Sequence, residues 1–63
     1  MAVTGEVLFE FRRIGNSVKV TAFHPPTLTE ISVVGAANAG QAQLQALALK
    51  RLEYVLAKRQ PSG

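Results

Sequence analysis

The sequence predicts an α+β domain in which a three-stranded antiparallel meander is followed by one C-terminal helix packed on one face of the sheet (β-β-β-α). Two observations support this fold class. Apolar and polar residues alternate with a period of two in three separate runs, which is typical of half-buried strands. The last third of the chain then changes to a helical pattern. Because the chain has only 63 residues, we expect a single domain over residues 1–63.

The first two alternating runs form a predicted hairpin. The first run covers residues 6–14 and the second covers residues 17–23. Between them, Gly15 and Asn16 belong to the residue types that accept the positive φ of tight hairpin turns. A two-residue loop, at Gly15 and Asn16 or at Asn16 and Ser17, aligns the apolar faces of both strands, whereas a three-residue loop does not.

A proline-containing connection separates the hairpin from the third run. Pro25 and Pro26 lack the amide proton that a strand ladder needs, so this segment is expected to be a turn or a loosely held edge. His24 precedes the prolines, and we expect it to be a solvated turn residue. The third run covers residues 29–34 and is expected to pair antiparallel with the second.

The C-terminal stretch predicts one helix over residues 39–59. It contains no glycine or proline apart from Gly40 at its start and is rich in strong helix formers. Asn38 could cap the first turn, with Gln41 returning the bond three residues later. Residues 60–63, which include Pro61 and Gly63, are expected to form a disordered tail.

The faces of these elements define a predicted core. The apolar side of each strand and one stripe of the helix face each other across a single layer boundary. The predicted core residues are Val7, Phe9, Phe11, Val18, Val20, Ala22, Ile31, Val33, Leu44, Ala48, Leu52, Val55 and Leu56.

Apolar residues outside this core predict an interface. Leu8, Phe23 and Val34 lie on the outer face of the predicted sheet, and Leu47 and Tyr54 lie on a flank of the helix. Exposed apolar surface of this kind is typical of a binding site. The simplest partner is a second copy of the chain. The leading interpretation is therefore a small, non-enzymatic interaction domain that forms a homodimer.

An alternative function is nucleic-acid binding by the sheet face. The chain carries a net charge of +3, and Arg12, Arg13 and Lys19 flank the hairpin turn. The stretch from Arg13 to Thr21, which contains Gly-Asn-Ser followed by alternating apolar residues, resembles the swapped-hairpin DNA-binding proteins of the AbrB and MazE type. This resemblance implies that Arg12, Arg13 and Lys19 approach DNA, although Phe23 stands where that family has a proline.

Catalysis is not expected. The chain has no cysteine and one histidine, and its sequence suggests no nucleophile beside a base and no convergent set of metal ligands. We therefore expect no catalytic residue, no metal and no cofactor. No apolar run reaches the length of a membrane span, and the first residues lack the pattern of a signal peptide, so a cytoplasmic protein is expected.

Four short motifs extend over most of the chain. They read G-E-V-x-F-E-F at residues 5–11, G-N-x-V-K-V at 15–20, T-E-x-S at 29–32, and L-E-x-V-L within 47–56. In this order the chain resembles short, uncharacterised bacterial proteins. The resemblance implies a stand-alone domain of unknown function with no catalytic residues to assign.

Overall fold

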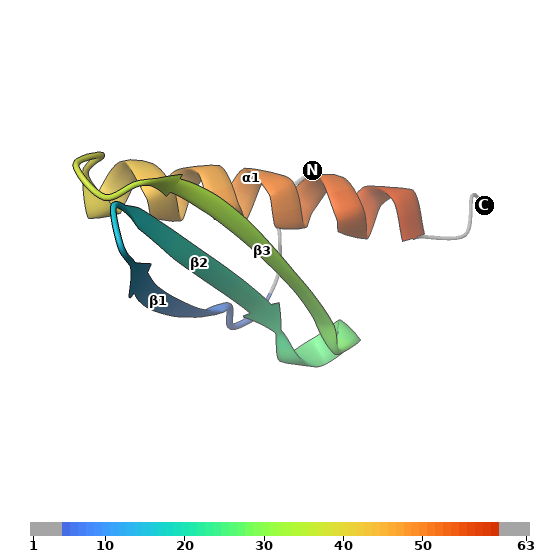
Figure 1. Ribbon diagram of the computed structural model, residues 1–63. Helices are drawn as coiled ribbons and strands as arrows, with labels where there is room; N and C mark the ends of the chain where they lie inside the picture. The colour runs from blue at the N-terminus through green and yellow to red at the C-terminus, as the bar shows by residue number, and fades with distance from the viewer. Residues whose placement is uncertain (1–4, 60–63) are drawn as a thin grey trace.

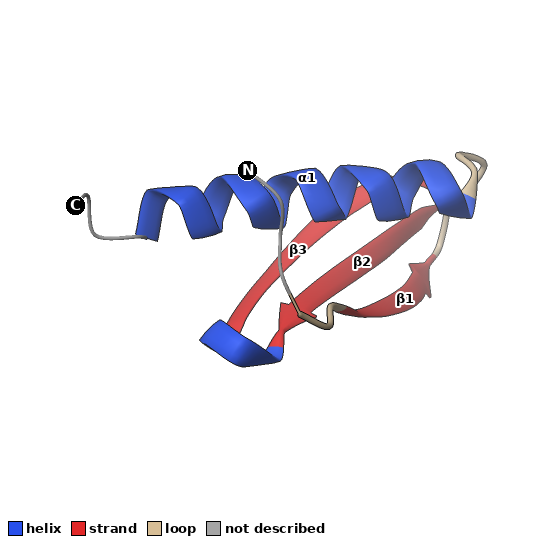
Figure 2. Ribbon diagram, turned by 180° about the vertical axis from the view of Figure 1, so that it is seen from behind, coloured by secondary structure: helices blue, strands red, loops and turns tan. Residues whose placement is uncertain are grey.

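The computed structural model describes residues 5–59, in which three strands are followed by one long helix. Strands β1 (Leu8–Ile14), β2 (Ser17–His24) and β3 (Thr29–Ala36) form one antiparallel sheet in the order β1-β2-β3. Helix α1 (Gln41–Arg59) lies across one side of this sheet (Figures 1 and 2). The α+β, β-β-β-α fold class is as predicted. The tail expected at residues 60–63 lies outside the described residues.

The β1–β2 hairpin closes with a two-residue turn. Ile14 pairs with Ser17, which leaves Gly15 and Asn16 as the loop. Gly15 has φ 59°, a value that glycine adopts at little cost. The even loop length places Phe11 opposite Val20, so the apolar sides of both strands face α1.

The proline-containing connection is a short 3₁₀ helix, η1 (Pro25–Thr27). It follows directly on His24, the last residue of β2. The expectation that His24 is a solvated turn residue was wrong, because its side chain is only 4% exposed. Its even position in β2 directs the side chain to the same face as Val20 and Ala22, which is the face that α1 covers.

The start of α1 differs from the expected one. The helix begins at Gln41, two residues later than predicted, and the Leu44 N–H donates to the Gly40 carbonyl at 3.0 Å. Gly40 is therefore the N-cap residue, and Asn38 lies in the preceding turn. The Ala39 N–H donates instead to the Ala36 carbonyl at 3.0 Å, which folds the connection back on the end of β3.

The core lies between α1 and the helix-facing side of the sheet. Its position follows the predicted faces closely, and Val55 is half-buried outside the main cluster. Two residues outside the predicted core, Ala39 and Leu49, also pack against it. The buried apolar residues are Val20, Ala22, Leu44, Ala48, Leu52 and Leu56, and the half-buried ones packed against them include Val7, Phe9, Phe11, Val18, Ile31 and Val33.

Candidate functional site

The face of the sheet that points away from α1 is not covered by any described element. We call it the outer face. Strand alternation assigns to it the even residues of β1, the odd residues of β2 and the even residues of β3. In register these residues form four rows: Leu8, Phe23 and Glu30; Glu10, Thr21 and Ser32; Arg12, Lys19 and Val34; Ile14, Ser17 and Ala36.

The three predicted nucleic-acid contacts do not share one surface. Arg12 lies directly opposite Lys19 on the outer face, so the two cations are cross-strand neighbours. Arg13 lies opposite Val18 and therefore belongs to the helix-facing side. Like charges directly opposite each other destabilise a sheet. The Arg12–Lys19 pair is consequently a place where an anionic partner would be favoured.

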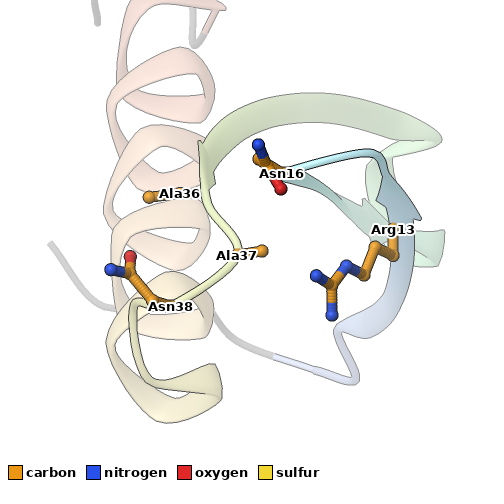
Figure 3. Close-up of a pocket in the computed structure, with 5 residues that line it drawn as sticks. All are labelled: Arg13, Asn16, Ala36, Ala37 and Asn38. Carbon is orange, nitrogen blue, oxygen red and sulfur yellow. The ribbon is translucent and has the colours of Figure 1, made fainter.

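Arg13 borders an open pocket of about 490 Å³ at the end of the hairpin. Its Nε donates to the Gly15 carbonyl at 3.0 Å, which orients the guanidinium. Figure 3 shows this side chain extending beside the Ala36–Asn38 connection, with Asn16 and Asn38 as the other polar groups of the pocket. The lining mixes these polar groups with two alanines. The pocket is widely open and Arg13 itself is exposed, so the pocket is a surface notch rather than an enclosed site.

The five predicted interface residues divide into two groups. Leu8 and Phe23 are cross-strand partners at one end of the outer face. Val34 lies on the same face but on the far edge strand, close to the helix flank that carries Leu47 and Tyr54. Ile14 also exposes a large apolar side chain on the outer face and was not predicted. Its place in the β1 alternation was the signal that could have found it.

A groove runs between the open edge of β3 and one flank of α1. We call it the β3-edge groove. It has a volume of about 650 Å³. Three apolar side chains in it are exposed by half or more: Val34 by 65%, Leu47 by 50% and Tyr54 by 56%. Its lining residues are Ser32, Val33, Val34, Leu47, Lys50, Arg51 and Tyr54.

A partly buried polar cluster lies at the end of the sheet away from the hairpin turn. The Arg59 Nη1 donates to the Thr29 hydroxyl at 2.7 Å, and the Thr27 hydroxyl donates to the same oxygen at 2.8 Å. His24 Nδ1 lies 2.8 Å from the Thr27 hydroxyl. When Thr27 donates to Thr29, its oxygen is left to accept, so His24 Nδ1 is the donor in that arrangement. The cluster ties the end of α1 to the β2–β3 connection.

The comparison with protein-family models decides which family the chain belongs to. The model of DUF6898, described as a domain of unknown function, matches residues 4–59. The chain belongs to the DUF6898 family. Neither the search of curated proteins nor the search of solved structures gives a significant match.

The geometry of this DUF6898 domain presents two surfaces suited to binding. The outer face mixes apolar residues with both signs of charge. The β3-edge groove combines apolar and cationic side chains beside an open strand edge. Within residues 5–59, no helix is long and apolar enough to cross a membrane.

Proposed function

We propose that the DUF6898 domain is a small, non-enzymatic interaction module that self-associates by packing the outer faces of two copies against each other. The observation that carries this proposal is the bare outer face, on which Leu8, Ile14 and Val34 are exposed. A sheet with one apolar-bearing face is stabilised when a second layer covers that face. The dimer would have four layers, with the two sheets inside and the two helices outside.

Charge complementarity favours a second copy as the covering layer. The outer face carries two acids, Glu10 and Glu30, and two bases, Arg12 and Lys19. Consider a two-fold axis between the two sheets, perpendicular to the strands, that passes between the Glu10 row and the Arg12 row. It places Glu10 of each copy over Arg12 of the other. The same axis places Leu8 over Ile14, so apolar residues meet at both ends of the interface.

The size of the face sets the expected strength. Three strands of up to eight residues form a face of roughly 14 Å by 26 Å, or about 400 Å² per copy. Standard stable interfaces bury about 800 Å² per partner. We therefore expect a weak dimer that forms at micromolar or higher concentration.

Charge-reversal variants test the proposed arrangement. Glu10→Arg and Arg12→Glu should each weaken self-association, because each places like charges over one another across the two-fold axis. A 1:1 mixture of the two variants should restore it. In that heterodimer the introduced arginine of one copy faces the introduced glutamate of the other, and the two unchanged side chains also pair with opposite charge. Sedimentation velocity over a range of concentrations, with circular dichroism to confirm folding, measures both effects.

A Leu47→Gln variant is the matched control, since it removes an exposed leucine that is not on the outer face. It should self-associate like the unchanged chain. The proposal is overturned if the unchanged chain is a strict monomer at high micromolar concentration, or if the mixture of charge-reversal variants stays monomeric.

The like-charged pair Arg12–Lys19 favours nucleic-acid binding as a second candidate function. Phosphates could neutralise the pair, and affinity would then fall steeply with salt. Glu10 and Glu30 on the same face weigh against this alternative. Titrating labelled duplex and single-stranded DNA at low salt tests it: salt-sensitive binding that Lys19→Ala weakens supports this candidate, and absence of binding at low salt ends it.

A further inference from the structure

The backbone of β3 presents free hydrogen-bonding groups along its open edge. The Ala37 N–H donates to the Asn16 carbonyl at 2.8 Å, in register with the Ser17–Ala36 pair. In an antiparallel ladder, hydrogen-bonded pairs alternate with non-bonded ones. The odd residues of β3 therefore bond to β2, and the even residues direct their N–H and C=O groups to the open edge. These even residues are Glu30, Ser32, Val34 and Ala36.

The β3-edge groove lies directly beside these groups. An added strand would send alternate side chains toward α1, where Leu47 and Tyr54 provide exposed apolar surface. Its other side chains would continue the outer face next to Val34. Main-chain bonds to the edge and pockets for alternate side chains are the two requirements for recognition of an extended peptide.

The charge of the groove indicates which peptide fits. Lys50 and Arg51 line it, and no acidic residue is among the lining residues. Lys58 lies over the Tyr54 ring, with its Nζ 5.4 Å from the ring centroid, and adds a third cation to this flank. On the outer face, Lys19 of β2 lies opposite Val34 of β3. The edge from Ser32 onward is therefore flanked by positive charge on both faces.

We propose that an extended peptide segment of a partner protein, alternating apolar and acidic residues, adds to the open edge of β3 as a fourth strand and places alternate side chains in the β3-edge groove. This binding uses the edge of β3 and the flank of α1, whereas the self-association proposed above uses the outer face, and the two surfaces share Ser32 and Val34. Substitutions outside the shared residues, such as Glu10→Arg and Leu47→Glu, let the two activities fail or succeed separately.

A second copy of the chain fits this edge less well. Gly35 lies against Leu44 at one end of β3, and Thr29 bonds to Arg59 at the other, so the middle of α1 runs beside the middle of the strand. Pairing two β3 strands about a two-fold axis near Ser32 would bring Lys50 and Arg51 of both copies together. Four cations around one axis oppose such a dimer.

Proline substitution at Ser32 tests the backbone contact. The Ser32 N–H faces the open edge, so Ser32→Pro removes a donor to the peptide and leaves the β2–β3 ladder bonds in place. Ser32→Ala is the matched control, because it loses the same hydroxyl and keeps the N–H. Arg13→Pro makes the equivalent change on the open edge of β1. Circular dichroism should show that all three variants fold.

The probe is a fluorescein-labelled eight-residue peptide of alternating Val or Thr and Glu, and fluorescence anisotropy measures its affinity. We expect Ser32→Pro and Leu47→Glu each to weaken binding at least tenfold, and Ser32→Ala and Arg13→Pro to leave it within about twofold. Two N-methylated forms of the peptide, methylated at odd or at even residues, should differ, because only one set of N–H groups can face β3.

Several results would overturn the proposal. These are no binding of the peptide to the folded chain at high micromolar concentration, equal binding of a peptide with Lys for every Glu, and unchanged binding to Ser32→Pro. If Ser32→Pro abolishes self-association and Ser32→Ala does not, the occupant of the edge is a second copy. Glu10→Arg should retain peptide binding, which separates this test from that of the outer face.

Discussion

At the scale of single residues, Gly35 is the position where the packing of α1 on β3 leaves no room for a side chain. A Cβ built there would overlap the Cδ2 methyl of Leu44. Leu44 is buried in the core cluster, so its movement would disturb the core contacts that hold the first turns of α1 against the sheet. The absence of a side chain at Gly35 therefore fixes how closely the helix approaches the strand.

We expect Gly35→Ala to destabilise the domain by about 1–3 kcal/mol through overpacking. Leu44→Ala alone should cost about 2–5 kcal/mol because it opens a cavity. The double variant should be less unstable than the sum of the two, since removing the leucine makes room for the new methyl group. Urea unfolding followed by circular dichroism measures all four forms, and strict additivity would show that the two positions do not compete for space.

Thr29 is the buried residue on which the polar cluster with Thr27 and Arg59 depends. It is 3% exposed and its hydroxyl accepts from both Thr27 and Arg59. Replacing it with valine keeps the shape and leaves two donors without their acceptor. Thr27 and Arg59 are themselves exposed, so water can replace the lost acceptor, and the cost is that of two hydrogen bonds at about 0.5–1.5 kcal/mol each.

Thr29→Val should therefore lower the free energy of unfolding by about 1–3 kcal/mol. Thr21→Val is the comparison, because the Thr21 hydroxyl contacts Ser32 on the exposed outer face at 3.2 Å. That change should stay within about 0.5 kcal/mol at a concentration where the chain is monomeric. Equal losses for the two variants would mean that burial of the cluster contributes nothing.

At the scale of elements, the C-terminal end of the helix is held to the sheet by a side-chain hydrogen bond. Arg59 is in the last turn of α1, and its bond to Thr29 reaches the first residue of β3. Lys58 lies in the same turn and is placed equally well to interact with the helix dipole, but its Nζ lies over the Tyr54 ring within the helix itself.

We expect Arg59→Ala to fray the last turn of α1, and Lys58→Ala to leave it in place. Amide hydrogen exchange should show faster exchange for residues 55–59 in the first variant, with the middle of the helix unchanged. Equal amide exchange rates for residues 55–59 in the two variants would contradict the interpretation that Arg59 holds the end of the helix to the sheet.

The sequence predicted the elements from local patterns and missed details that depend on neighbours. The β1–β2 hairpin followed from the parity of its loop, which any pairing of two half-buried strands must satisfy. The start of α1 did not follow from the sequence in this way. Asn38 and Gly40 are both acceptable N-cap residues, and the choice between them depends on the hydrogen bond from the Ala39 N–H to the Ala36 carbonyl. His24 was misjudged because the second strand was predicted to end at residue 23, whereas β2 continues to His24 and directs its side chain to the helix-facing side.

In the candidate site, too, some features follow from local sequence patterns and others depend on how the elements pack. Arg12 and Arg13 are consecutive in a strand, so their separation onto opposite faces could have been predicted from alternation alone. The β3-edge groove could not, because Val34, Leu47 and Lys50 come together only through the lateral position of α1 on the sheet. No sequence pattern within β3 or α1 specifies which strand of the sheet the helix packs against.

At the scale of the whole molecule, the small core limits the stability of a single copy. Chains near this length bury only about 60% of the surface that they expose when unfolded. The fully buried apolar residues of the cluster include two alanines, Ala22 and Ala48. Covering the outer face in a dimer would add apolar contact that one copy lacks.

We therefore expect the midpoint temperature of unfolding to rise with protein concentration, since association stabilises the folded state by mass action. Glu10→Arg should remove this dependence and leave the midpoint at the dilute value. Differential scanning calorimetry from low to high micromolar concentration measures both. A midpoint independent of concentration in the unchanged chain would contradict a dimeric state.

The register of β3 has a consequence for which substitutions the domain tolerates. The residues whose amides face the open edge, Ser32 and Val34 among them, also point their side chains to the outer face. The odd residues between them, such as Ile31 and Val33, contribute to the core. If both proposed surfaces are used, β3 contains no spare position. A substitution at Val34, which belongs to both surfaces, would then affect both partners, whereas substitutions at Glu10 and Leu47 would each affect only one.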